Sequence, residues 1–227
     1  DSLLPSPTLA ADYHYRALRH AQESGDAAKA AGHADWLVQN AQGSVYEQLA
    51  LIVAAKAADE AVKTASGDAL AKARQHGLEV YSRLAKALGD SPEEIASKKN
   101  ALVAQSRLAQ YAQDLGRHRE AAEAWEKVLA AYPKDRETLR AAGLAWFRAG
   151  VFDQSIVHWR TLLAGLEGGS EAWHEAKYYQ TACLARIDRP TAREVFDQFK
   201  LLYPDLGPEP WRAKFAALEK ELGAGRP

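Results

Sequence analysis

The chain has 227 residues, of which 47% are hydrophobic and 26% charged, and its formal net charge is −1. This balance excludes the bulk electrostatic attraction that draws basic proteins to nucleic acid or to anionic lipid, and the apolar fraction is typical of a globular chain rather than a disordered one. No run of about 18 apolar residues is present, so the sequence predicts no membrane span.

The inventory of reactive residues restricts the chemistry further. The only cysteine, Cys183, cannot form an internal disulfide, and its place in an apolar stripe between Tyr179 and Ile187 predicts a buried, inert thiol. None of the seven histidines has another at i+4, the spacing that places two imidazoles on one helical face. Phosphate-binding glycine loops and nucleophile elbows are also missing. We therefore predict no metal site, no cofactor and no catalytic residue.

The start of the chain contains two prolines and no methionine. Residues 1–8 are predicted to form an extended lead-in, and the lack of an initiating methionine indicates a processed product or an excised piece. Abundant alanine and arginine suit a bacterial source, with cytoplasm and periplasm both open. A helix is then expected from about Leu9 to Glu23, followed by a turn at Gly25 and a partner helix that ends near Gly43.

Capping patterns predict where the next helices begin. The stretch 44–47, Ser-Val-Tyr-Glu, has the spelling of a capping box, and Asp68 is expected to cap a later helix. Gly77 lies inside that later helix and should mark a close crossing, because a helical glycine costs about 1 kcal/mol relative to alanine. The stretch 91–94, Ser-Pro-Glu-Glu, predicts the start of a long helix whose second half is 102–115.

From residue 102 onward, one pattern of large and small residues is written twice. Gly116 recurs as Gly150 and Trp125 as Trp159, both at a difference of 34 (150 − 116 and 159 − 125). Weaker matches at the same spacing join small or apolar residues: Ala109 with Gly143, Ala121 with Ser155, Val128 with Leu162, Leu129 with Leu163 and His118 with Phe152. Two helices around a tight turn in about 34 residues are the signature of tetratricopeptide repeat (TPR) arrays. The chain therefore resembles that family, and its tryptophans are expected in the core.

A third copy follows after three additional residues. The Tyr-Pro pair that ends at Pro133 returns ending at Pro204, a difference of 71 (204 − 133), which is two repeats of 34 plus three. This copy is atypical, because Gln180 stands where a small residue is expected and Ile187 replaces the turn glycine. Terminal units of repeat arrays are often atypical. The resemblance thus covers three repeats over 102–204.

The last helix has one apolar face. Trp211, Phe215, Leu218 and Leu222 stand at i, i+4, i+7 and i+11, and charged residues of both signs occupy the other positions. A stacked array ends in an apolar surface that has to be covered, so we predict a capping helix. An amphipathic membrane helix is the alternative, and the mixed charges disfavour it.

The resemblance implies an all-α fold, a right-handed α–α superhelix of about eleven helices with a C-terminal capping helix. Its expected parts are the lead-in at 1–8, degenerate helical pairs over 9–101, three repeats over 102–204, and a capping helix and tail over 205–227. The implied function is a non-enzymatic adaptor or scaffold that binds a peptide or partner segment. A structural unit that assembles with itself through its end faces is the alternative. A helical enzyme accessory or a sugar-binding protein has only fold analogy behind it.

In the TPR family, the first helix of each pair lines an inner groove. The corresponding positions here are Gln110, Gln113, Arg140, Leu144, Phe147, Arg148, His174, Lys177 and Thr181. If the basic members face inward, they should orient an acidic segment, while the apolar members beside them supply an anchor. We therefore expect a protein or peptide partner, acidic with an apolar residue, and no nucleic acid.

Overall fold

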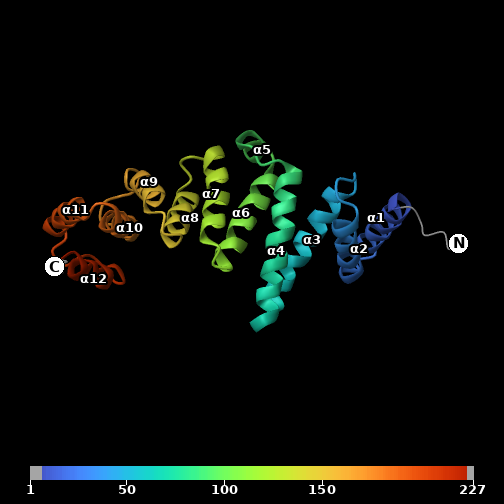
Figure 1. Ribbon diagram of the computed structural model, residues 1–227, viewed down its shortest axis with the longest axis horizontal. Coiled ribbons are helices and arrows are strands. Elements are labelled where there is room, and N and C mark those ends of the chain that lie inside the picture. Colours follow the sequence, from blue (N-terminus) through green and yellow to red (C-terminus); the bar gives the residue numbers. More distant parts are fainter. Residues whose placement is uncertain (1–6, 224–227) are drawn as a thin grey trace. The chain divides into compact units, whose positions relative to one another are not determined.

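The regular structure of the protein is entirely helical over the residues that the computed structural model describes, 7–223. This range contains twelve α-helices and no strand, and their order along the chain can be followed in Figure 1. They are α1 (Pro7–Glu23), α2 (Ala27–Asn40), α3 (Glu47–Thr64), α4 (Gly67–Leu88), α5 (Pro92–Ser97), α6 (Lys99–Asp114), α7 (His118–Ala131), α8 (Arg136–Arg148), α9 (Phe152–Leu163), α10 (Glu171–Ile187), α11 (Arg189–Leu202) and α12 (Trp211–Gly223). The prediction of an all-α fold of paired helices is confirmed.

The chain divides into two compact units, which we call the N-terminal unit (Asp1–Gly116) and the C-terminal unit (Arg117–Pro227). Within the N-terminal unit, α1 packs on α2, α2 on α3, α3 on α4 and α4 on α6, and the short α5 packs on α6. Within the C-terminal unit, α7 packs on α8, α8 on α9, α9 on α10 and α10 on α11. Each unit is therefore a series of helices in which a helix contacts the ones before and after it.

Gly77 lies at a close crossing between α4 and α6, as predicted. A methyl group added at Gly77 would lie 2.7 Å from Cζ of Tyr111, closer than side chains pack. Tyr111 is itself buried, with 5% of its surface exposed. The absence of a side chain at Gly77 is what allows the tyrosine ring to lie against the backbone of α4.

The helix start at 91–94 is confirmed, but the helix is shorter than expected. The Ser91 hydroxyl accepts a hydrogen bond from the Glu94 amide (3.2 Å), and the Glu94 carboxylate accepts one from the Ser91 amide (3.4 Å). The expected long helix is wrong, because Lys98 is extended (φ −117°, ψ 106°) and separates α5 from α6. The Lys98 ammonium donates to the carbonyl of Leu88 at the end of α4 (2.9 Å), so the break fixes two helices together.

Three other predicted boundaries are corrected. The capping box at 44–47 does not form, because the Glu47 carboxylate binds the Gly43 amide (2.6 Å) and Arg83 of α4 (2.5 Å) instead of reaching back to residue 44. Asp68 lies in the first turn of α4, after the N-cap residue Ser66, which makes no side-chain cap. The first helix begins at Pro7, two residues before the expected start, and residues 1–6 of the predicted lead-in lie outside the described range.

The predicted tryptophan core of the C-terminal unit is confirmed. Trp159 is fully buried and lies against Gly143 of α8, where an added methyl group would be 2.8 Å from the ring. The ring nitrogen of Trp159 donates to the Ser155 hydroxyl (3.0 Å), which donates to the Gly143 carbonyl (2.8 Å). Cys183 is buried with its sulfur 3.3 Å from the same hydroxyl, and burial raises the pKa of its thiol to about 11. The thiol is therefore held in its unreactive form.

The apolar face of the last helix is buried within the C-terminal unit. Trp211, Phe215, Leu218 and Leu222 are each at most 6% exposed, and α12 packs on both α10 and α11. Phe215 stacks on Phe199 of α11 with ring centroids 4.2 Å apart. This packing accounts for the apolar face without a membrane. No helix in the described range is long and apolar enough to cross one.

Candidate partner-binding groove

The exposed side of α3 borders three hollows of the N-terminal unit. The buried side of α3 is made mainly of alanines (Ala50, Ala54, Ala55 and Ala58), which allow α2 and α4 to approach it closely. The other side of α3 lies at the surface. Ile52 and Lys56 line both the first and the second hollow, and Asp59 lines both the second and the third. The hollows therefore form one continuous path along α3, which we call the α3 groove.

The first hollow of the groove is apolar and lined by small side chains. It has a volume of about 600 Å³ and lies between α3 and the α1–α2 hairpin, whose wall includes Ala21, Ala27, Ala28 and Ala30. Alanines carry a single methyl group, so the wall leaves space that a larger side chain would fill. Ile52 is 38% exposed at its edge. This end of the groove fits an apolar anchor residue.

The second hollow lies between α3, α4 and α6. Val103 of α6 is 44% exposed there, across from Ile52 and Lys56 of α3. Two exposed aliphatic side chains thus flank a lysine in the middle of the α3 groove. Exposed residues of this kind are unremarkable when isolated, but together in a concave surface they indicate a binding site.

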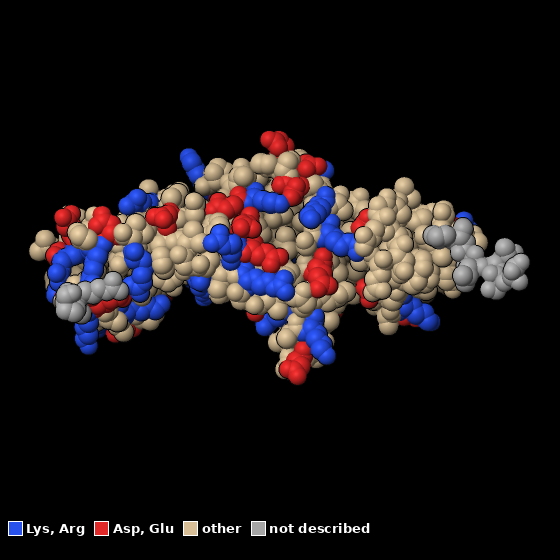
Figure 2. All heavy atoms as spheres, viewed as in Figure 1, with Lys and Arg blue, Asp and Glu red and all other residues tan. Residues whose placement is uncertain are grey.

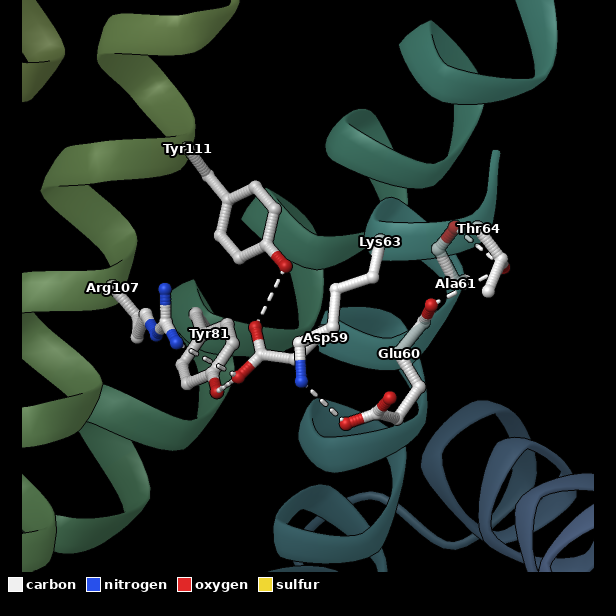
Figure 3. Close-up of polar contacts among 8 residues, drawn as sticks. All are labelled: Asp59, Glu60, Ala61, Lys63, Thr64, Tyr81, Arg107 and Tyr111. Carbon is white, nitrogen blue, oxygen red and sulfur yellow. Dashed lines mark hydrogen bonds and ion pairs between the residues drawn. The ribbon is translucent and has the colours of Figure 1, made fainter. Parts of the chain in front are cut away.

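A polar cluster of two buried tyrosines, the half-buried Asp59 and the exposed Arg107 closes the third hollow (Figure 3). Asp59 of α3 accepts hydrogen bonds from the hydroxyls of Tyr81 on α4 (2.9 Å) and Tyr111 on α6 (2.7 Å), and Arg107 of α6 lies 3.6 Å from the same carboxylate. Burial, followed by the hydrogen bond to Asp59, raises the pKa of both tyrosines above the ordinary value. The phenols therefore stay protonated as donors, and the cluster ties three helices together at the edge of the groove.

The remaining charges of the α3 groove are mostly paired. Lys63 binds Glu60 on the same helix (2.7 Å), and this hydrogen bond lowers the pKa of the Glu60 carboxyl. Asp114 lies 3.4 Å from Arg74 of α4. Lys56 is exposed in the middle of the groove, and its charge also helps to lower the pKa of the Glu60 carboxyl, although Glu60 makes its hydrogen bond with Lys63. Lys56 is therefore the cation that an incoming acidic group would meet.

The surface charge on the face shown in Figure 2 is mixed rather than gathered in a patch. Figure 2 shows lysines and arginines interspersed with acidic residues over α3 to α6 on the viewed face, while the surface over α1 and α2 is largely uncharged. A mixed surface does not attract a highly charged polymer as a whole. Recognition in the α3 groove consequently depends on individual contacts.

Of the positions predicted for an inner groove, Gln110 belongs to the α3 groove. It is exposed, lines the third hollow and accepts a hydrogen bond from Arg107 (3.1 Å). Gln113, on the same helix, is half-buried and does not line this hollow. The other predicted positions belong to the C-terminal unit, on the neighbouring helices α8 and α10.

Three of those other positions are buried and cannot contact a ligand in this structure. Leu144, His174 and Thr181 are 8%, 2% and 0% exposed, so their expected place in an open groove is corrected. His174 donates from Nδ1 to the Ser170 carbonyl (2.9 Å) and lies against Gly207, where an added methyl group would be 2.5 Å from the imidazole. The segment before α12 therefore covers the part of α10 that the repeat pattern placed in the groove.

Two members of the expected basic set are less available than predicted. Arg140 makes two hydrogen bonds to the Glu175 carboxylate (2.6 and 2.7 Å), which offset its charge. Lys177 is half-buried, and the loss of hydration lowers the pKa of its ammonium. Phe147 is half-buried, with its ring edge-on to that of Tyr179 (5.0 Å between centroids). Arg148 is exposed, and its charge acts on the same tyrosine.

The residues that form the α3 groove were missed because they come from separate helices. Asp59, Tyr81 and Tyr111 are 22 and 30 residues apart (81 − 59 and 111 − 81), and no repeat spacing links them. One signal was available in the sequence, because Asp59 interrupts an alanine-rich stretch. A carboxylate that is partly removed from water requires hydrogen-bond partners, so this residue indicates a polar contact between helices.

Comparison with known proteins gives similar folds only. No family model and no curated protein matches the chain. It is similar to the solved structure of a MamA RS-1 ArsTM double mutant (16% identity, TM-score 0.45, covering 95% of this chain and 98% of that one). It is also similar to MamA 41-end from Desulfovibrio magneticus RS-1 (16% identity, TM-score 0.42, covering 86% of this chain and 96% of that one). A third similar structure is a Podosopora anserina putative kinesin light chain with nearly identical TPR-like repeats (16% identity, TM-score 0.47, covering 88% of this chain and 97% of that one).

Proposed function

We propose that the protein is a non-enzymatic interaction module that holds a segment of another protein in the α3 groove. The continuity of the three hollows along α3 is the observation that carries this proposal. From Ile52 to Lys63 the groove follows 11 residues of helix (63 − 52), or about 17 Å at 1.5 Å per residue. That length accommodates about three turns of a helix or about five residues of an extended segment.

The lining of the groove defines the chemistry of the segment. A bulky apolar side chain fills the alanine-lined hollow, and a carboxylate next to it pairs with Lys56. Glu60 lines the first hollow beside Lys56, and Asp59 and Asp114 line the third, so these carboxylates would repel a run of several acidic residues. We therefore favour a segment with one acidic residue beside apolar ones, which retains the acidic partner expected from the sequence and assigns it to the N-terminal unit.

The state of the polar groups in the groove supports binding rather than catalysis. The Asp59 carboxylate is occupied by two phenol hydroxyls and Arg107, and Glu60 is occupied by Lys63. A general base needs a free lone pair and a nucleophile needs an adjacent base. The groups of this groove instead hold one another in place.

A peptide selection tests the proposal. The full chain is used to select binders from a display library of random peptides, and the recovered peptides are measured against Ile52→Arg and Lys56→Glu variants. Ile52→Arg should abolish binding because it fills the middle of the groove with a charged side chain. Lys56→Glu should weaken the binding of acidic peptides and strengthen the binding of basic ones.

The matched control is Val157→Arg. Val157 is 54% exposed on α9, in the C-terminal unit and outside the groove, so this variant should bind the peptides as the parent does. Peptides that bind Ile52→Arg as tightly as the parent would place the binding site elsewhere. A library that yields no binder would contradict the proposed function itself.

A further inference from the structure

Two histidines lie in the packed seam between α1 and α2. His14 stands three residues after Ala11 and four before Leu18, so it belongs to the buried stripe of α1. His33 stands three residues after Ala30 on α2. The apolar residues around the pair are at most 6% exposed, namely Ala11, Leu18 and Ala21 on α1 and Ala30, Ala34 and Leu37 on α2. Both histidines are half-buried, so each imidazole is partly removed from water.

The two imidazoles face each other through their Nδ1 atoms. These atoms are 3.0 Å apart, and the ring centroids are 5.1 Å apart. The His14 ring stacks on the indole of Trp36 (3.9 Å between centroids, 4° between planes). The Tyr13 ring lies edge-on to both imidazoles (5.2 and 6.2 Å between centroids). Aromatic contacts from both helices therefore hold the two histidines in this arrangement.

This arrangement accommodates one added proton but not two. In the neutral pair, the Nδ1–H group of one imidazole donates to the bare Nδ1 atom of the other. A first added proton binds Nε2 of the donor ring, which keeps that hydrogen bond and makes it charge-assisted. A second added proton binds the accepting Nδ1 atom, so that two donors and two like charges face each other at 3.0 Å. The second protonation therefore breaks the contact between α1 and α2.

Burial and the neighbouring charge both disfavour the second proton. Removal from water, followed by the charge of His33, lowers the pKa of His14 below its ordinary value of 6.5. The face of Trp36 suits an imidazolium at His14, so it stabilises the state with one added proton. Two imidazoles that interact in this way titrate in two steps that belong to the pair rather than to either residue.

The acidic side chains of α1, α2 and the turn between them have partners of their own. These pairs are Asp12 with Arg16 and Tyr46, Glu23 with Arg19, Asp26 with Lys29, and Asp35 with His76 of α4. On α3, which packs on α2, Lys56 and Glu60 line the first hollow, and Glu60 binds Lys63 (2.7 Å). Repulsion between the two imidazolium groups is therefore what separates the two protonation steps.

We propose that the contact between His14 and His33 is a pH-sensitive switch, which holds α1 on α2 until both imidazoles are charged and then releases it. The contribution of His14 to the stability of the α1–α2 hairpin is fully present above the unfolded pKa of 6.5, and it is lost as the pH falls through the lower folded pKa. The same hairpin supplies the alanine wall of the first hollow. A loss of ligand at acid pH follows only if the proposed function of the α3 groove is correct, whereas the switch itself does not depend on it.

An NMR titration of the histidine side chains in the full chain tests the switch directly. The signals of His14 and His33 are assigned from their loss in His14→Asn and His33→Asn. In the parent, the pair should titrate in two steps about one pH unit or more apart. A single step for both side chains, with the value of an exposed imidazole, would overturn the proposal without reference to any variant's stability.

Amide exchange measures the release of the helix. The protection of α1, corrected for the intrinsic exchange rate, should fall by about tenfold for each pH unit below 6.5 until the second step is passed, because the opened hairpin binds one more proton than the closed one. The helices α4 and α6 of the same unit should keep their protection. Protection of α1 that stays constant between pH 7.5 and pH 5 would contradict the switch.

Asparagine variants separate the charge from the hydrogen bond. Asparagine places a neutral polar group near the position of Nδ1, so His33→Asn should raise the pKa of His14 and make the fall of protection less steep. The double variant with His14→Asn should abolish the fall. His20→Asn is the matched control, because His20 is an exposed histidine on the same helix, and its fall should equal that of the parent. The readout is the slope with pH, so a variant that weakens the hairpin at every pH still gives an answer. A double variant with the slope of the parent would refute the role of the pair.

A peptide from the selection on the α3 groove gives the functional readout. Its affinity should fall between pH 7.5 and pH 5 for the parent and should stay constant for the double asparagine variant. An equal fall for both proteins would show that the switch does not control the first hollow. A library without a binder would count against the groove alone, since the titration and the exchange measurement use no peptide.

Discussion

A glycine exchange tests the packing that supports the α3 groove. Gly77→Ala places a methyl group 2.7 Å from the ring of Tyr111, where ordinary contacts begin at about 3.4 Å, so the ring must move by roughly 0.7 Å. Overpacking of this kind costs about 1–3 kcal/mol. It also stretches the 2.7 Å hydrogen bond to Asp59, and bonds to charged groups contribute about 1.5–3 kcal/mol. Alanine offsets about 1 kcal/mol through its better helix propensity. We expect a net loss of about 1–3 kcal/mol.

Gly32→Ala is the control in the same unit. Gly32 lies inside α2 with no atom within 4 Å of an added methyl group, so alanine should stabilise the unit by up to about 1 kcal/mol. Urea unfolding followed by circular dichroism, with amide exchange in α4 and α6 reporting on the N-terminal unit, measures both variants. A Gly77→Ala protein as stable as Gly32→Ala would show that the α4–α6 crossing is loose and that Tyr111 does not depend on it.

Three further outcomes can be measured in the C-terminal unit. Trp211→Ala should lower the free energy of unfolding by about 3–5 kcal/mol, because this side chain at the start of α12 is only 6% exposed, and an unchanged melting temperature would contradict this burial. Cys183 should resist alkylation at pH 8 until the protein unfolds, because burial raises its pKa to about 11; rapid labelling of the native chain would show an open core. The pKa of the Glu126 carboxyl is lowered, mainly by its hydrogen bond with His158 (2.6 Å). The contribution of this carboxyl to the free energy of unfolding is therefore fully present above the unfolded pKa of 4.5, and it is lost as the pH falls through the lower folded pKa. Glu126→Gln should therefore reduce the decrease in unfolding free energy at acid pH. If the variant loses stability at acid pH as steeply as the parent, the lowered pKa of Glu126 is refuted.

Local and repeating features of the fold could be predicted from the sequence. The turn glycines Gly116 and Gly150 have φ of 72° and 73°, as the 34-residue period indicates, because this backbone conformation favours glycine. The burial of Trp159 against Gly143 also follows from the repeat pattern, which places a small residue on the first helix of a pair and a large one on the second. Such features depend on residues close in sequence or one repeat apart.

The candidate site depends on contacts that the period does not contain. The Glu175 carboxylate that offsets Arg140 lies 35 residues away on another helix, and nothing in the spacing of basic residues indicates it. His174 is buried by a segment that precedes the last helix and belongs to no repeat. Family positions therefore located the first helices of the pairs correctly but misjudged which of their side chains reach the surface. The repeat pattern does not predict the contacts of an atypical end unit.

The alanine wall of the first hollow gives the α3 groove a thermodynamic character of its own. Ala27, Ala28 and Ala30 lie on helices rather than on loops, so the space is present before any partner arrives. An apolar side chain that enters displaces water from a preformed surface, and the reliable mark of that process is a negative heat capacity change. Affinity along a series of anchor residues from alanine through valine and leucine to phenylalanine should follow their volume until the hollow is full. The groove then selects its ligand by size, and exchanging one wall alanine for leucine would move that limit without altering a single charge.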